Sequence, residues 1–178
     1  MNYEKIINLV ESWIEKLIEN PVILNHHLRT RDYLLILDSK VSIESQISAL
    51  TYDIERQMED KVPTPKNEKE YDEAYLINHG KNSAKYVINF LEENDLEIDF
   101  NKLSFLISNH EAGGNYETNL LRDADSLSFL EVVVEGFAKK YSKEFSRHKF
   151  KYMLERIENK KAKELAKPLF EEAMKLLD

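Results

Sequence analysis

Apolar side chains recur at three- and four-residue steps along almost the whole of this sequence, and few chain-breaking residues interrupt them. The 178 residues include only four glycines and four prolines. Such steps place the apolar side chains on one face of an α-helix, whereas a β fold needs an alternating pattern and frequent turns. The sequence therefore predicts an all-α fold. Its length suits one well-packed core, so we expect a single helical-bundle domain over residues 1–178.

Breaks in the apolar pattern divide the chain into expected helices. Asn20-Pro21 ends the first one, because proline cannot continue a helix. The adjacent glycines of EAGGN mark the sharpest break, and KVPTPKNEKE is a polar loop with two prolines. The charge-rich C-terminal stretch is expected to form a solvated outer helix, interrupted or kinked near Pro168. The expected helices cover about 2–19, 22–38, 42–60, 72–93, 99–110, 117–142 and 146–176.

Charge and composition narrow the class of protein. The formal net charge is −8, from 33 acidic and 25 basic side chains, which argues weakly against nucleic acid as the main partner. The absence of cysteine removes disulfides, thiolate zinc sites and cysteine nucleophiles, and it fits a reducing compartment. The N-terminal segment does not have the pattern of a signal peptide, and no apolar run of 18 residues could span a membrane. We therefore expect a cytoplasmic protein with no membrane partner.

Five polar residues stand on or beside apolar faces of different expected helices. They are His26, Asp53, His79, His110 and Asp125. Asp53, for example, adjoins the apolar face of SIESQISAL, and a buried carboxylate is costly unless something pairs with it. Any one of the five is more often an ordinary core residue, but together they can share one partner. Imidazole and carboxylate ligands at one point suit Fe, Mn, Zn, Ni or Co.

The order of these residues resembles that of the HD-domain phosphohydrolase superfamily, helical bundles named after an adjacent His-Asp pair. The segments that carry the resemblance are HHLR, ALTYDIER, HGKNSAKYVINFL, LISNHE and RDADSLSFLE, over about residues 22–135. The first expected helix, about 2–19, and the C-terminal one, about 146–176, lie outside it. The clear departure is Tyr52, which stands where the family has the histidine of its pair.

The resemblance implies one or two divalent transition-metal ions. The implied ligands are His26, Asp53 and Asp125 for the first ion, and Asp53, His79 and His110 for the second. Three protein ligands suffice for a catalytic ion with open positions for water. A neutral tyrosine is a poor ligand near pH 7, because its ordinary pKa is about 10. Tyr52 therefore weakens the expectation for the first ion.

Alternatives remain at several of these positions. His27 is the rival of His26, but its neighbours at +4 and +11 are polar, which favours His26. Asp123 is the rival of Asp125; the second fits the A-D-x-L segment of the family better, and a helix-start role for the doublet is the ordinary alternative. His148 is expected to be exposed.

The resemblance further implies a metal-dependent phosphohydrolase that acts on a small phosphorylated compound, with nucleotides among the candidates. Asp53 would be a catalytic ligand, and Glu111 would be a general base, an acceptor for an imidazole N–H, or simply solvated. Arg29 and Arg56 would bind phosphate, because each follows an expected ligand by three residues. Lys81 and Arg122 are weaker candidates, and for any of the four a surface position or an ordinary i,i+4 pair is the alternative.

Two other functions remain open. The chain could be a binding module of HD-like fold without turnover, a reading that Tyr52 favours, or a helical interaction protein with a vestigial site. Apolar side chains such as Phe137 and Tyr141 leave a homo-oligomer as a further possibility.

Overall fold

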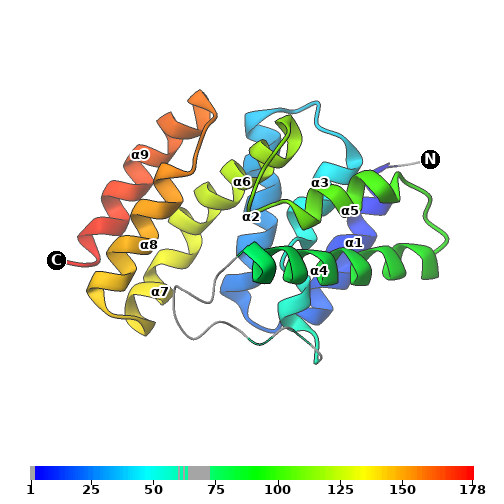
Figure 1. Ribbon diagram of the computed structural model, residues 1–178, viewed down its shortest axis with the longest axis horizontal. Coiled ribbons are helices and arrows are strands. Elements are labelled where there is room, and N and C mark those ends of the chain that lie inside the picture. Colours follow the sequence, from blue (N-terminus) through cyan, green and yellow to red (C-terminus); the bar gives the residue numbers. More distant parts are fainter. Residues whose placement is uncertain (1–2, 60, 62, 64–72) are drawn as a thin grey trace.

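The computed structural model describes residues 3–59, 61, 63 and 73–178. These residues form an all-helical bundle without strands (Figure 1), which confirms the expected fold class. The α-helices are α1 (Tyr3–Leu17), α2 (Pro21–Leu37), α3 (Ile43–Thr51), α4 (Glu73–Glu93), α5 (Phe100–Ser108), α6 (Tyr116–Ser128), α7 (Val134–Lys140), α8 (Lys143–Glu155) and α9 (Lys160–Lys175). A short 3₁₀ turn, η1 (Ile54–Gln57), follows α3, and a π turn, η3 (Phe129–Val133), joins α6 to α7. None of the described helices is long and apolar enough to cross a membrane.

Side-chain caps fix where the helices begin. Asn20 caps α2: its Oδ1 accepts a hydrogen bond of 2.9 Å from the backbone N–H of Val22, while Pro21 takes the first helical position. Asn115 and Thr118 form a reciprocal capping box at the start of α6. Four other helices, α3, α5, α8 and α9, begin at a residue whose side chain accepts a backbone N–H of the first turn. These residues are Ser42, Asp99, Ser142 and Asn159.

The expected helix over 42–60 is wrong at its C-terminal end. The α-helical part, α3, ends at Thr51, and η1 starts only at Ile54. Asp53, at φ −109° and ψ 14°, lies in the break between them. Its side chain therefore leaves a helix end, where it is free to turn toward α4 and α5, and does not lie in the middle of a helix.

The expected single helix over 146–176 is also wrong: it is a hairpin of α8 and α9 (Figure 1). The turn falls at Arg156–Asn159, because the carboxylate of Asp123 accepts the backbone N–H groups of Glu158 and Asn159 at 3.0 and 2.7 Å. Pro168 lies inside α9 and does not end it. Most of the expected loop KVPTPKNEKE lies outside the described residues.

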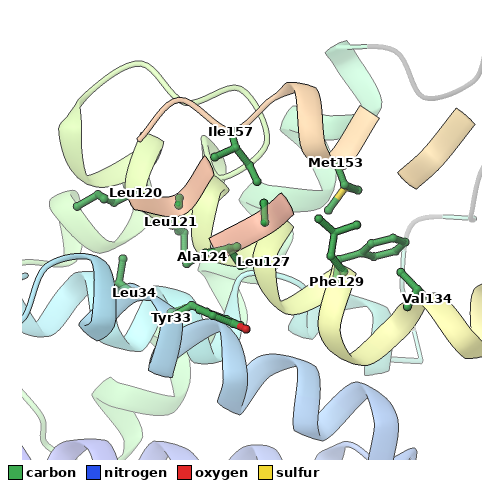
Figure 2. Packing of buried hydrophobic residues seen from close by; sticks show 14 of the residues in the cluster. Tyr33, Leu34, Leu120, Leu121, Ala124, Leu127, Phe129, Val134, Met153 and Ile157 are labelled. Carbon is green, nitrogen blue, oxygen red and sulfur yellow. The ribbon is translucent and has the colours of Figure 1, made fainter. Parts of the chain in front are cut away.

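Two clusters of buried apolar side chains form the core. One is built by α6, η3, α8 and α9 with part of α2, and Figure 2 shows its side chains, among them Leu34, Leu127 and Met153. The other is built mainly by α1, α3, α4 and α5. Helix α2 contributes Tyr33 and Leu34 to the first cluster and packs partly buried side chains against the second. The expected site residues lie on elements of both clusters.

Candidate metal centre

Three of the expected ligands converge at one point: Asp53 after α3, His79 on α4 and His110 just after α5. One ligand atom from each lies within 4.8 Å of the others. Asp53 Oδ1 is 3.0 Å from His79 Nε2 and 3.6 Å from His110 Nε2. Both histidines are buried, while a quarter of the Asp53 side chain is exposed. This group could hold a metal ion that keeps one open side.

The three facing atoms are all unsatisfied. Asp53 Oδ1, His79 Nε2 and His110 Nε2 are buried and have no hydrogen-bond partner among the described residues. Leaving one buried polar atom without a partner costs about 1–3 kcal/mol, so native structures rarely do it. Three such atoms aimed at one point fit a shared cation, and the imidazole and carboxylate donors fit a first-row transition metal.

The far nitrogen of the His110 ring is held in the manner of a metal-bound histidine. His110 Nδ1 lies 2.7 Å from the carbonyl oxygen of Ile107. Because a carbonyl only accepts, Nδ1 carries the proton and Nε2 keeps its lone pair. A carbonyl partner of this kind orients histidine ligands in metal sites. His79 Nδ1 lies 3.5 Å from the buried carboxylate of Glu55 but makes no hydrogen bond with a described residue.

A glycine sets the distance between the two histidine-bearing helices. A Cβ atom built on Gly80 would lie 2.9 Å from the Cα of Ser108 on α5, closer than side chains tolerate. Glycine therefore lets α4 and α5 approach until the rings of His79 and His110 are 5.2 Å apart, centroid to centroid. In the sequence, Gly80 is part of the segment HGKNSAKYVINFL, and the pattern alone does not predict that it sets the distance between α4 and α5.

Asp53 is ionised, and its charge acts on His79. Burial alone would raise the pKa of Asp53, but Arg56 and His79 hold it well below its usual value. Burial alone would lower the pKa of His79, but Asp53 raises it. Arg56 Nε donates to Asp53 Oδ2 at 3.0 Å, and its NH1 donates to Tyr75 at 3.3 Å, so the expected phosphate ligand Arg56 lies beside the centre.

The other two expected ligands, His26 and Asp125, lie in a second network around Tyr52. The Tyr52 hydroxyl donates to Asp125 Oδ1 at 2.7 Å and lies 2.9 Å from His26 Nε2. His26 Nε2 is itself 3.2 Å from Asp125 Oδ1. Burial and then Asp125 raise the pKa of Tyr52 well above its usual value, so the phenol is neutral. Its hydroxyl oxygen thus occupies the position between His26 and Asp125 that a shared ion would need.

Arg156, at the end of α8, is a site residue that sequence reasoning missed. Its side chain is 7% exposed, and its guanidinium donates to Asp125 Oδ2, to Glu111 Oε2 and, at 2.7 Å, to the Ser126 hydroxyl. It lies beyond the expected core of 22–135. The only sequence signal was its place beside the apolar stripe of α8, and that signal does not identify a partner.

Glu111 is held between Arg156 and the metal centre. Its Oε2 accepts from Arg156, while its Oε1 lies 4.0 Å from His110 Nε2. Burial alone would raise the pKa of Glu111, but Arg156 and then His110 keep it below its usual value. Glu111 is therefore a carboxylate that accepts hydrogen bonds next to the three ligands.

The structure places Arg29 in surface ion pairs. Its guanidinium contacts Glu131 at 2.7 and 3.0 Å and Asp32 at 2.9 Å, and it is not among the groups that contact the three converging ligands. Its role in binding phosphate stays a prediction.

The rival residues have structural explanations. His27 is 1% exposed despite its polar sequence neighbours, and its ring lies 5.0 Å from that of Tyr52. Burial, followed by the neighbouring His26, lowers the pKa of His27 to about 4, so it is neutral. The carboxylate of Asp123 accepts backbone hydrogen bonds from the turn between α8 and α9. His148 is exposed, as expected.

Comparison of the chain with protein-family models, with curated proteins and with solved structures finds no match in any of the three.

Proposed function

We propose that this chain is a metal-dependent phosphohydrolase that acts on a small phosphorylated compound, and that it is a divergent member of the HD-domain superfamily. One observation carries the proposal: three buried ligand atoms, on Asp53, His79 and His110, face one another without hydrogen-bond partners. The sequence resemblance supplies the reaction class, and the cationic side chains beside the centre support a phosphorylated ligand.

The donor set supports one ion more strongly than two. Asp53, His79 and His110 offer one ion three ligands and leave positions open for water and substrate. The other implied ion would need His26 and Asp125 as ligands, and the Tyr52 hydroxyl already joins these two side chains. Nitrogen and oxygen donors suit Fe, Mn, Zn, Ni or Co.

Each side chain then has a stated task. When bound, a divalent ion lowers the pKa of a coordinated water from about 16 to about 7 in favourable cases, which makes hydroxide available near neutral pH. Asp53 and the two histidines hold the ion, and Arg56 keeps Asp53 ionised. Glu111, whose Oε1 lies 4.0 Å from His110 Nε2, would accept a hydrogen bond from a water bound beside the ligands.

A second candidate function is a metal- or ligand-binding module without turnover. The specific observation for it is Tyr52: the hydroxyl satisfies two residues that the family uses as ligands, so the centre has fewer ligands than the family pattern. This candidate predicts metal and phosphate binding with no hydrolysis.

Elemental analysis of protein purified without chelator tests the proposal, with Asp53→Asn as the site variant. Asp53→Asn keeps the shape of the side chain and removes its charge; Asp95→Asn, an exposed position, is the matched control. We expect about one transition-metal equivalent in the wild type and in Asp95→Asn, and a large loss in Asp53→Asn. A phosphomonoester such as p-nitrophenyl phosphate, assayed with added Mn, Co, Ni, Fe or Zn, should be hydrolysed only by the first two proteins.

The outcomes separate the candidates. Metal binding with no hydrolysis of any phosphoester above the level of Asp53→Asn would favour the binding module. No bound metal, and no rise in melting temperature on adding any of these ions, would overturn both.

A further inference from the structure

Three polar side chains lie along one face of α8 and its C-cap, and the last of them, Arg156, contacts Asp125 of the second network. Lys149, Tyr152 and Arg156 are spaced three and four residues apart, so they lie on the same face of the helix. The Lys149 ammonium lies 5.1 Å from the centre of the Tyr152 ring, and the Arg156 guanidinium lies 5.5 Å from the same centre. Both cations thus lie within cation–π distance of one aromatic ring.

The Lys149 ammonium also contacts the start of η3, next to the end of α6. Its ammonium lies 5.6 Å from the ring centre of Phe129, the first residue of η3. The preceding residue, Ser128, lies 2.7 Å from His26 Nδ1. Lys149 therefore lies within cation–π distance of both Phe129 and Tyr152, and Arg156 lies within that distance of the same Tyr152 ring.

The cations near the centre differ in how they are paired. Arg156 is bound to two carboxylates and a hydroxyl, and Arg56 to Asp53 and Tyr75. In contrast, no described carboxylate lies within ion-pair distance of Lys149 Nζ, although Glu111, Asp125 and Asp53 are all close enough to act on its charge. Burial, followed by Arg156, lowers the pKa of Lys149, which is the electrostatic result expected of an ammonium that lacks a partner of its own.

We propose that Lys149 is the anion anchor of this centre and that it binds the phosphoryl group of the ligand beside the Tyr152 ring. The inference rests on the proposed function for the reaction, but anion binding by Lys149 can be measured separately from metal binding and from turnover. An ammonium held by aromatic rings can donate up to three hydrogen bonds to phosphate oxygens without breaking an existing ion pair. Arg156 remains in its carboxylate pairs and positions Glu111 and Asp125.

The test compares Lys149→Met with Lys151→Met, because both remove one positive charge from α8, and Lys151 is exposed. Inorganic phosphate binding is measured by calorimetry on metal-free and metal-loaded protein, and metal content by elemental analysis. Loss of one charge-assisted hydrogen bond should weaken phosphate binding by about tenfold to a hundredfold in Lys149→Met. Metal content should not change, and Lys151→Met should bind phosphate like the wild type.

Three results would overturn the inference: wild-type protein that binds no phosphate with or without metal, unchanged affinity in Lys149→Met, or an equal loss in both variants. The last would show a long-range charge effect and no defined anchor. If the wild type binds no metal but phosphate binding still depends on Lys149, the proposed function fails and the anion site stands. If metal binds and Lys149→Met does not weaken phosphate binding, the anion site fails and the proposed function stands.

Discussion

Tyr52 donates a hydrogen bond of 2.7 Å to Asp125 across 73 positions of sequence, and the same hydroxyl lies 2.9 Å from His26. The bond ties the end of α3 to the middle of α6, and both side chains are buried. A neutral hydroxyl here contacts both a carboxylate and an imidazole. The centre is thereby divided into a satisfied network around Tyr52 and an unsatisfied one around Asp53.

Replacing Tyr52 with phenylalanine tests this division. Tyr52→Phe keeps the ring in the core and removes only the hydroxyl, leaving Asp125 and His26 with one partner fewer. Removing a hydrogen bond from a buried carboxylate costs about 1–3 kcal/mol. The free energy of unfolding, measured by urea denaturation, should therefore fall by that amount. Metal content should stay at the wild-type level, since Tyr52 is not one of the three converging ligands. Loss of the metal would show that the two networks are one centre.

Replacing Arg156 should have a larger effect on stability. Arg156→Met removes the buried cation that pairs with both Asp125 and Glu111, so each of these carboxylates loses its ion pair with an arginine. Breaking a buried ion pair from one side costs about 3–5 kcal/mol. Arg147→Met on the same helix is the control, because Arg147 makes no ion pair with a described residue and should change stability little. Equal effects of the two substitutions on the urea midpoint would contradict the buried role of Arg156.

The sequence was sufficient for the helical class and for part of the centre. Period-3.6 patterning predicts the all-α bundle, and polar residues on apolar helix faces pointed to Asp53, His79 and His110, which the fold brings together. Periodicity cannot place breaks that long-range contacts create. The turn after Arg156 depends on the carboxylate of Asp123, a partner more than 30 residues away, and so it was not foreseen.

The close approach of α4 and α5 gives a prediction about Gly80. A methyl group at this position meets the backbone of Ser108 at 2.9 Å, and backbone cannot rotate away. Gly80→Ala should therefore move the two helices apart, lower the free energy of unfolding by about 1–3 kcal/mol, and weaken metal binding through the altered spacing of His79 and His110. Metal titration followed by thermal melting measures both effects.

Gly136→Ala is the matched control for Gly80→Ala. Gly136 lies in α7, and a Cβ atom there meets nothing within 4 Å. Alanine in an uncrowded helical position raises stability by about 0.4–1 kcal/mol, because it restricts the unfolded chain. We therefore expect Gly80→Ala to lower the free energy of unfolding and Gly136→Ala to raise it. A stabilising effect of Gly80→Ala, or unchanged metal affinity, would contradict the role of Gly80 in setting the centre.

The contacts of Glu117, which lies outside the metal centre, predict how the stability of the protein depends on pH. Its Oε1 accepts hydrogen bonds from the hydroxyls of Ser42 and Ser45 at the start of α3, and its Oε2 pairs with Lys102 on α5 at 2.7 Å. Burial alone would raise the pKa of Glu117, but Lys102 and the two serines lower it below the ordinary value of 4.5. The unfolded chain therefore binds the proton more readily than the folded protein. The stabilisation is present in full above about pH 4.5 and is lost as pH falls through the lower, folded-state pKa.

Glu117→Gln should remove this pH-dependent term. We expect the variant to be less stable than the wild type by about 1–2 kcal/mol at pH 7, the range for charge-assisted hydrogen bonds that are partly exposed. The difference between the two proteins should shrink below pH 4.5, because the wild-type carboxyl then becomes neutral like the amide. Urea denaturation at pH 7 and at several values below pH 4.5 measures it, with Glu97→Gln as the exposed control. A difference that stays constant across this range would show that Glu117 acts by shape alone and not by its charge.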